Sequence, residues 1–251
     1  MAEISLGIPV FNSARFLDEL FNNLCMLDPI PAEIVFLDDA SSDDSASRIE
    51  HFIAEHGAAV GARLIRSERN AGIAGAYNRL AHEARSDFVQ LLDADDILAD
   101  IDFYARVQPA LRDNIDIVIT GLRSNARLLD LCSRAFGKIV PRQLPPWWPV
   151  LGSFATRAGV IYRRQRLLEA PFPDPMWPGS DVVHLLQLRR RETCVFLAQP
   201  RVLYRVHRDA QSSRQRDYAS YRHALAQFDC PTRVTHLLDL GLRDVGRRWM
   251  R

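Results

Sequence analysis

The segment Phe88-Val89-Gln90-Leu91-Leu92-Asp93-Ala94-Asp95-Asp96 joins a short apolar run directly to three carboxylates. Five residues rich in Leu, Val and Phe are typical of a buried strand, so we predict a strand over Phe88–Leu92. Ile34–Leu37 has the same form, because Asp38 and Asp39 follow it at once. In open parallel sheets, ligands bind at the carboxyl ends of the strands, so acidic pairs in that position indicate a binding site.

The residues around these two strands alternate between short apolar runs and amphipathic stretches. After the apolar run Ile4–Phe11, large hydrophobic residues recur at helical spacing from Phe16 to Leu24. This alternation is typical of βαβ units on a parallel sheet. We therefore predict an α/β fold with these further elements: a helix through Ile49 and Ile53, a strand over Arg63–Ile65, a helix through Tyr77 and Leu80, a helix over Asp100–Leu111 and a strand over Ile115–Thr120.

The pattern weakens from about Arg123 onward, where prolines and tryptophans cluster. We expect a loop-rich second half followed by a helical tail from Tyr218. A chain of 251 residues suits one large α/β domain about as well as two small ones, and we expect one domain. The elements predicted for this half are strands over Gly159–Tyr162, Cys194–Ala198 and Val202–Val206 and a helix over Asp181–Leu188.

The composition argues against several classes of protein. Hydrophobic residues make up 47% of the chain and charged residues 25%, which is near the globular average, so wholesale disorder is not expected. A formal net charge of +1 gives no reason to expect a nucleic-acid partner. The four cysteines form no CxxC pair, and the sequence contains neither a signal-peptide pattern nor an apolar run long enough to span a bilayer. We therefore expect a soluble cytoplasmic protein.

Asp93 and Asp95 are candidate metal ligands, because two carboxylates one residue apart after a buried strand can face one cation from a single tight turn. Mg²⁺ and Mn²⁺ prefer oxygen ligands and complete their coordination with substrate phosphates and water. Aspartate is also common in turns and helix caps, so the triplet alone leaves an ordinary solvated turn as the alternative.

Four motifs occur in order along the first hundred residues: Ile4-Ser5-Leu6-Gly7-Ile8-Pro9-Val10-Phe11-Asn12, Leu37-Asp38-Asp39-Ala40-Ser41-Ser42-Asp43, Asn70-Ala71-Gly72 with Asn78, and Leu92-Asp93-Ala94-Asp95-Asp96. Together they closely resemble the donor half of glycosyltransferase family 2, whose members are inverting enzymes of the GT-A fold. The resemblance covers residues 3–98. It implies a mostly parallel central sheet flanked by helices, in one domain over residues 1–251. Within it we expect a nucleotide-sugar-binding half at 1–122, an acceptor-binding half at 123–216 and a C-terminal helical tail at 217–251.

The resemblance also implies roles for residues of the donor half. The backbone of the first motif would line the base and ribose, the acid after the second strand would hydrogen-bond the base, and Asp93 and Asp95 would hold Mn²⁺ or Mg²⁺. Ala40 departs from the family, in which a glycine is common there, and this restricts the turn. The nucleotide-sugar-binding residues implied in this way are Pro9, Val10, Phe11, Asn12, Asp39, Asn70, Gly72 and Asp93.

Two segments of the second half are similar to the same family. Pro178-Gly179-Ser180-Asp181 followed by an apolar stretch resembles its acidic pair at a helix start, which implies that Asp181 is the catalytic base. Ser180 replaces the first acid, so one negative neighbour that could raise the pKa of Asp181 is missing. An N-cap aspartate is the structural alternative.

The second segment is Tyr204-Arg205-Val206-His207, in which the resemblance makes His207 a further metal ligand or a diphosphate contact. A neutral imidazole is a suitable ligand, although a lone histidine is more often structural. Arg205 or Arg208 could contact phosphate instead.

Aromatic residues in the proline-rich loops are candidates for acceptor binding. Trp177 and Trp148 can stack on a sugar ring, or they can fill the core beneath long loops. The stripe from Val234 to Trp249 with its flanking arginines is compatible with peripheral membrane association and, more simply, with packing against the core or a partner.

The sequence and the resemblance together predict a metal-dependent inverting glycosyltransferase with a nucleotide-sugar donor, UDP-sugars being favoured, and a glycan or lipid-linked acceptor. The family-level expectation is bacterial surface polysaccharide synthesis in the cytoplasm or at the inner face of the membrane. One alternative is a sugar-phosphate nucleotidyltransferase, but Pro9-Val10-Phe11-Asn12 is not the Gly-rich phosphate loop such enzymes favour. The other is a catalytically inactive module that binds nucleotide sugars.

Overall fold

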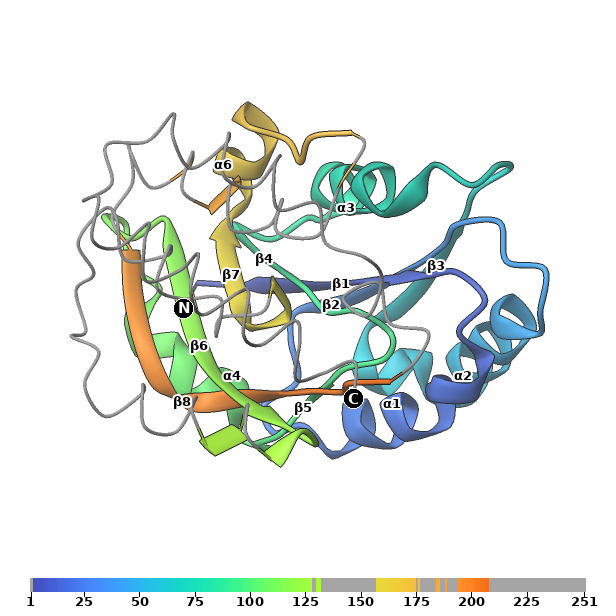
Figure 1. Ribbon diagram of the computed structural model, residues 1–251, viewed down its shortest axis with the longest axis horizontal. Helices are drawn as coiled ribbons and strands as arrows, with labels where there is room; N and C mark the ends of the chain where they lie inside the picture. The colour runs from blue at the N-terminus through green and yellow to red at the C-terminus, as the bar shows by residue number, and fades with distance from the viewer. Residues whose placement is uncertain are drawn as a thin grey trace.

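The structure, a computed structural model, describes residues 2–127, 130–131, 157–174, 176, 184–185, 188 and 194–207. These residues form an eight-stranded sheet with the strand order β3-β2-β1-β4-β7-β6-β8-β5 and with helices on both faces (Figure 1). The sheet has a parallel half, made by the first third of the chain, and a mixed half, made by the residues that follow. The predicted α/β class is confirmed.

The parallel half contains β1 (Ile4–Val10), β2 (Glu33–Asp38), β3 (Ala62–Arg66) and β4 (Phe88–Leu91). β1 pairs in parallel with both β2 and β4, and β2 pairs in parallel with β3. The connecting helices are α1 (Ala14–Met26), α2 (Ser45–Val60) and α3 (Gly72–Glu83). Every residue of β1, β2 and β4 is buried, which explains why these strands have mostly apolar sequences instead of alternating ones.

Two hydrophobic clusters cover the two faces of this sheet. Phe36 of β2 belongs to the cluster beneath α1 and α2, whereas its neighbours Val35 and Leu37 belong to the cluster beneath α3. Successive side chains of a strand point to opposite faces, so one strand contributes to both clusters. Figure 1 shows α1 and α2 on one side of the sheet and α3 with α6 (Arg164–Glu169) on the other.

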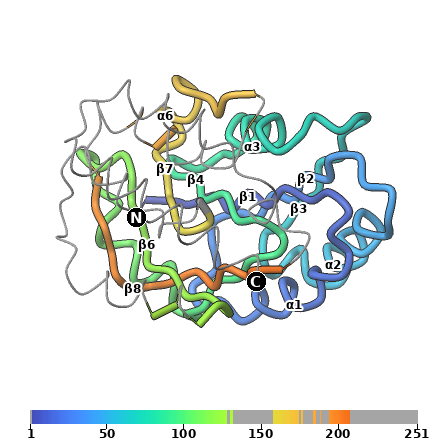
Figure 2. The backbone as a smooth tube through the Cα atoms, viewed as in Figure 1, coloured from blue at the N-terminus to red at the C-terminus, as the bar shows by residue number. Residues whose placement is uncertain are grey.

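The mixed half adds β5 (Ile97–Leu98), β6 (Ile117–Ser124), β7 (Val160–Arg163) and β8 (Cys194–Tyr204). β7 lies antiparallel between β4 and β6, β8 runs parallel to β6, and β5 is antiparallel to β8. Figure 2 shows β8, in orange, running along β6 toward α1. The residues that follow β8 therefore lie beside α1, where Arg205 contacts Glu19 and His207 contacts Phe16.

Several predicted elements differ from the observed ones. The two strands predicted over Cys194–Ala198 and Val202–Val206 are the single strand β8, whose register with β6 shifts between Thr120 and Gly121. A Cβ atom at Gly121 would lie 2.4 Å from the carbonyl oxygen of Ala198, so the shift requires glycine there.

The helix predicted over Asp100–Leu111 is shorter than expected. It consists of α4 (Phe103–Val107) followed by the 3₁₀ turn η1 (Gln108–Ala110). Pro109 has no amide hydrogen to donate to the preceding turn, which accounts for the end of the α-helix. Three short elements were not predicted: β5, α6 and the 3₁₀ turn η3 (Arg157–Gly159).

The remaining predictions concern residues that the structure describes only in part. His184, Leu185 and Leu188 of the helix predicted over Asp181–Leu188 are helical. The predicted tail at 217–251 lies outside the described residues. None of the described helices combines the length and the apolar character that crossing a membrane requires.

Candidate functional site

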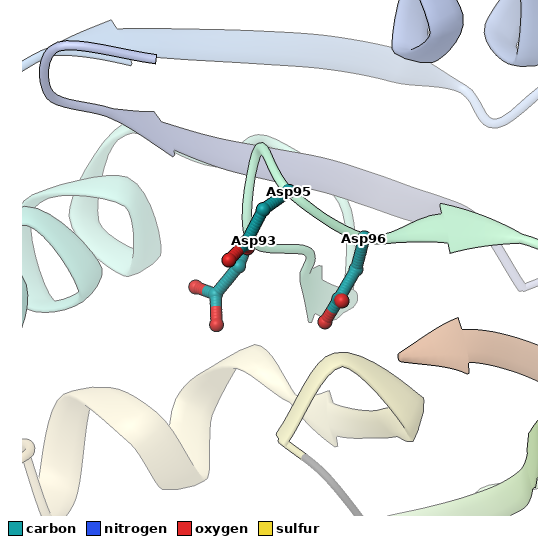
Figure 3. A group of neighbouring side chains, drawn as sticks. All are labelled: Asp93, Asp95 and Asp96. Atoms are coloured by element: carbon teal, nitrogen blue, oxygen red, sulfur yellow. The ribbon is translucent and has the colours of Figure 1, made fainter. Parts of the chain in front are cut away.

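The turn that follows β4 carries the acidic residues of the candidate site. We call Asp93–Asp96 the acidic turn; it is closed by a hydrogen bond from the amide of Asp96 to the carbonyl of Asp93, at 2.9 Å. Asp93, Asp95 and Asp96 each offer a carboxylate oxygen, and these oxygens all lie within 4.8 Å of one another (Figure 3). The two aspartates predicted as metal ligands are therefore together, and Asp96 is a third member that was not predicted as a ligand.

The electrostatics of the acidic turn suit a cation. Burial raises the pKa of the Asp95 carboxyl above its usual range and the charge of Asp93 adds to this, whereas the hydrogen bond from His207 acts in the opposite direction. Crowded carboxylates in a half-buried turn repel one another, and a divalent cation would offset that repulsion. Carboxylate oxygens are also the ligands that Mg²⁺ and Mn²⁺ prefer, so the residues present fit such an ion.

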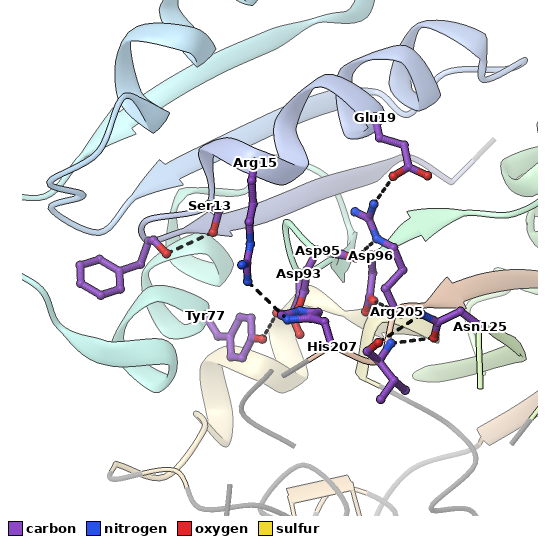
Figure 4. A network of polar contacts seen from close by, with 12 residues as sticks. Ser13, Arg15, Glu19, Tyr77, Asp93, Asp95, Asp96, Asn125, Arg205 and His207 are labelled. Carbon is purple, nitrogen blue, oxygen red and sulfur yellow. Dashed lines mark hydrogen bonds and ion pairs between the residues drawn. The ribbon is translucent and has the colours of Figure 1, made fainter. Parts of the chain in front are cut away.

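His207 reaches the acidic turn from the end of β8. Its Nε2 atom lies 2.8 Å from Oδ2 of Asp95, although the two residues are 112 positions apart in the chain. Nη2 of Arg15 lies 3.5 Å from its Nδ1 atom (Figure 4). The ring of His207 also lies 4.9 Å from the ring of Phe16. The structure thus brings His207 to the predicted metal ligands, while its role as a ligand stays a prediction.

Two further side chains contact the acidic turn and were not predicted to do so. The hydroxyl of Tyr77, a fully buried residue of α3, donates a hydrogen bond to Oδ1 of Asp93 (Figure 4). Arg205 donates from its side chain to the carbonyl oxygen of Asp95 and from its backbone amide to Oδ1 of Asp96, the latter at 3.0 Å. The acidic turn is therefore held both by Tyr77, 16 positions before Asp93, and by Arg205, 110 positions after Asp95.

The loop before α3 is shaped by residues of the predicted nucleotide site. The carboxylate of Asp39, which is buried, accepts the amide of Ala71 at 3.0 and 3.1 Å. The amide of Gly72 donates to Oδ1 of Asn70 at 2.8 Å, and Gly72 has a φ of 72°, a left-handed conformation that favours glycine. Asp39 thus has a structural contact besides the base contact predicted for it.

The end of β1 places the first motif next to the turn that follows β2. Pro9 and Val10 are buried, whereas Phe11 is 49% exposed. Oδ1 of Asn12 accepts the amides of Ser42 and Asp43 at 2.8 and 3.3 Å. The side chain of Asn12 therefore ties the two turns together.

The predicted catalytic base and acceptor residues, Asp181, Trp177 and Trp148, lie outside the described residues. Met176, which precedes Trp177, and His184, three residues after Asp181, are described. His184 is fully buried, and its Nε2 atom lies 2.7 Å from the carbonyl oxygen of Ala170. The ring of His184 also packs against Phe172, with 4.0 Å between ring centroids.

Some residues at the site carry no signal in the sequence. Tyr77 falls on the apolar stripe of its helix and reads as a core residue, and Asn125 reads as an ordinary loop residue. Asp96 does have a signal, because it directly follows Asp95 in the same motif, and on that ground it could have been predicted as a third ligand. The hydrogen bonds of Asn125 with Val206 and of Arg205 with the acidic turn join residues 81 to 110 positions apart, and no local sequence pattern indicates such contacts.

Comparisons with known proteins identify the family of this chain. Residues 5–167 match the family described as glycosyl transferase family 2. A curated relative is glycosyltransferase GlyG of Streptococcus pneumoniae, which is 25% identical over 116 residues, covering 46% of this chain and 38% of that protein. The alignment therefore spans well under half the length of this relative.

Solved structures show the same fold. TarS 1–349 of S. aureus, in complex with UDP-GlcNAc, has a TM-score of 0.67 and 17% identity, covering 89% of this chain and 64% of that one. The mannosyltransferase PcManGT of Pyrobaculum calidifontis, in complex with GDP-Man and Mn²⁺, has a TM-score of 0.63 and 18% identity, covering 90% and 61%. At these identities the likeness establishes the GT-A fold alone. Because the family match extends over more than half of its length, this chain belongs to glycosyl transferase family 2.

Proposed function

We propose that this chain is a metal-dependent inverting glycosyltransferase that moves a sugar from a nucleotide-sugar donor, with UDP-sugars favoured, to a hydroxyl of a glycan or lipid-linked acceptor. The family membership supports sugar transfer. Among structures of the same fold, TarS is in complex with UDP-GlcNAc, and PcManGT with GDP-Man and Mn²⁺. The proposal includes a place in bacterial surface polysaccharide synthesis, in the cytoplasm or at the inner face of the membrane.

The convergence of the acidic turn and His207 is the observation that carries this proposal. Three carboxylates and one imidazole meet where β4 ends, while Asp39 lies where β2 ends, on the other side of β1 in the sheet. Ligands of open α/β sheets bind outside the carboxyl ends of the strands. A nucleotide diphosphate between these two places would meet oxygen ligands suited to a cation that is bound to its phosphates.

Each residue then has a role in the reaction. The backbone of Pro9–Asn12, the loop at Asn70–Gly72 and Asp39 would bind the nucleotide, while Asp93, Asp95 and His207 would hold Mn²⁺ or Mg²⁺. The cation, when bound, supplies positive charge for the leaving diphosphate. Asp181 would accept the proton of the acceptor hydroxyl, whose oxygen attacks the anomeric carbon from the side opposite the nucleotide. Trp177 and Trp148 would bind the acceptor.

A donor-hydrolysis screen tests the proposal. UDP-, GDP-, dTDP- and CMP-sugars are incubated with the chain and Mn²⁺, and released nucleotide is measured with and without EDTA. We expect one class of donor to be hydrolysed, EDTA to abolish the reaction, and Asp95→Asn to reduce it by at least about 10³-fold, since a cation contributes several kcal/mol of charge stabilisation. Asp102→Asn, at a surface aspartate of α4's N-terminus, is the control.

Full hydrolysis in EDTA would exclude the metal-dependent mechanism. Binding of a nucleotide sugar without any turnover, even when candidate acceptors are supplied, would favour the inactive binding module. Formation of a nucleotide sugar from a sugar phosphate would favour the nucleotidyltransferase.

A further inference from the structure

Residues 205–207 reach the acidic turn after the sheet has ended. The last residues paired between β6 and β8 are Ser124 and Tyr204. The position of His207 therefore depends on contacts that its own short segment makes beyond the sheet.

Asn125 makes two of these contacts. Its Nδ2 atom donates to the carbonyl oxygen of Val206 at 3.1 Å, and the amide of Val206 donates to its Oδ1 atom at 2.8 Å (Figure 4). The side-chain amide of Asn125 thus pairs with both the backbone amide and the backbone carbonyl of Val206. This contact extends the pairing of β6 with β8 beyond the last paired residues. The turn that carries Asn125 is itself held, because the amide of Ala126 donates to Oγ of Ser124 at 3.1 Å.

Arg205 provides the second anchor. Besides its contacts with the acidic turn, its guanidinium donates to Glu19 of α1 and lies over the ring of Phe16, at 5.2 Å from the ring centroid. Asn125 therefore ties the segment to the end of β6, and Arg205 ties it to α1. His207 follows directly, and its imidazole is thereby held 2.8 Å from Asp95.

We propose that Asn125 is a positioning residue of the site: by holding Val206, it keeps His207 against Asp95 and pre-organises the acidic turn for a divalent cation. The part that concerns the cation rests on the proposed function. Residues that orient a metal ligand without touching the metal commonly contribute 10- to 100-fold in affinity. Because Asn125 is exposed, we place its contribution at the lower end of that range, about 10-fold.

The first readout is hydrogen exchange of the folded, metal-free chain. Asn125→Ala should speed exchange of the amides at 204–207, since a segment released from its hydrogen bonds opens more often. The matched control is Asn23→Ala, because Asn23 clasps Leu98 in the same two-way manner, with both hydrogen bonds at 2.9 Å. That variant should leave exchange at 204–207 unchanged.

The second readout is binding of Mn²⁺ alone to the full chain, with free Mn²⁺ followed by electron paramagnetic resonance. Asn125→Ala should raise the Kd for Mn²⁺ about 10-fold. In a chain that already carries His207→Ala, the same change should have no further effect, because the residue that Asn125 positions is gone. Asn23→Ala should give the same fold-change in Mn²⁺ affinity with or without His207→Ala.

The outcomes separate this proposal from the function on which it rests. Unchanged exchange at 204–207 in a folded Asn125→Ala chain overturns the positioning role, as does a Mn²⁺ effect that simply adds to that of His207→Ala. If His207→Ala leaves Mn²⁺ affinity unaltered, the ligand role of His207 fails, and exchange alone decides the positioning role. Should Asn125→Ala not fold, Asn125→Gln keeps the amide but moves it by one methylene, and the same two readouts apply.

Discussion

The two halves of the sheet contribute to the site in different ways. In the parallel half, Asp39 and the acidic turn come directly after β2 and β4, so the ends of the strands place them. In the mixed half, His207 lies 112 residues from its partner Asp95 and is placed by the individual contacts of Asn125 and Arg205. The fold itself therefore positions the aspartates at the strand ends, whereas single side-chain contacts bring His207 to them.

The same device recurs where α3 meets the region after β7. Asn78 donates to the carbonyl oxygen of Phe172 at 3.0 Å and accepts its amide at 2.8 Å. Phe172 in turn packs against Tyr77, whose hydroxyl contacts Asp93. Two adjacent residues of α3 thus contact both the acidic turn and the segment that leads toward Asp181.

The largest effect that tests this comparison is expected at Asp181. An acceptor hydroxyl is a poor nucleophile until its proton is removed, so a positioned base contributes about 10²- to 10⁴-fold. We predict that Asp181→Asn lowers sugar transfer by that factor and leaves nucleotide affinity nearly unchanged. Transfer is measured with the donor found by the screen, and affinity by calorimetry.

Asparagine is chosen because it caps a helix about as well as aspartate does. If Asp181 is only an N-cap, Asp181→Asn will transfer sugar within a few-fold of the unaltered chain. In that case the assignment of the catalytic base to Asp181 is wrong, and another residue must accept the proton.

The parallel half could be predicted nearly residue by residue. Three of its four strands, β1, β2 and β4, are buried on both faces and have mostly apolar sequences, and the helices between the strands show regular spacing of large side chains. The acidic residues at the strand ends are also brought together as expected, because in a parallel sheet a strand end fixes a side chain in space, while their role in binding stays a prediction.

The mixed half was harder to predict for physical reasons. β8 is one strand that changes its register, so its middle residues do not alternate and look like a break between two strands. β5 has two residues, too few for any period to be recognised. The contacts of Asn125 and Tyr77 join distant parts of the chain, and hydrogen bonds between such residues leave no local pattern.

An intermediate effect is expected at Asp39, which belongs wholly to the parallel half. Asp39→Ala should weaken nucleotide binding by about 10- to 100-fold, because a hydrogen bond to a charged group contributes about 1.5–3 kcal/mol. The change also removes the acceptor for the amide of Ala71, so part of the loss would come from the loop before α3. Calorimetry with the nucleoside diphosphate of the preferred donor measures it.

Asp39→Asn separates the two contributions, because it retains an acceptor for Ala71 but loses the charge. If both variants lose affinity equally, the contact with the base dominates. If Asp39→Asn binds normally while Asp39→Ala does not, the residue acts through the loop, and unchanged affinity in both variants contradicts the assigned role.

The smallest effect is expected at Ala40, where the chain departs from the glycine common in its family. Ala40 has a φ of 60°, and the left-handed region costs a residue with a Cβ atom about 1–2 kcal/mol. Glycine adopts this conformation freely but loses about 0.4–1 kcal/mol through greater freedom in the unfolded chain. Ala40→Gly should therefore stabilise the protein by about 0.5–1 kcal/mol, or raise Tm by about 1–3 °C for a chain of this size.

Ala71→Gly is the matched control. Ala71 is exposed at a φ of −96°, so the chain should lose stability from the greater freedom of glycine in the unfolded state alone. Opposite shifts in Tm would show that the turn after β2 needs a left-handed residue whichever side chain it carries, whereas equal losses would show that Ala40 adopts an ordinary conformation. Ala40 directly follows Asp39, so the sign of the change in Tm also tests whether the backbone conformation of this turn positions the residue at the end of β2.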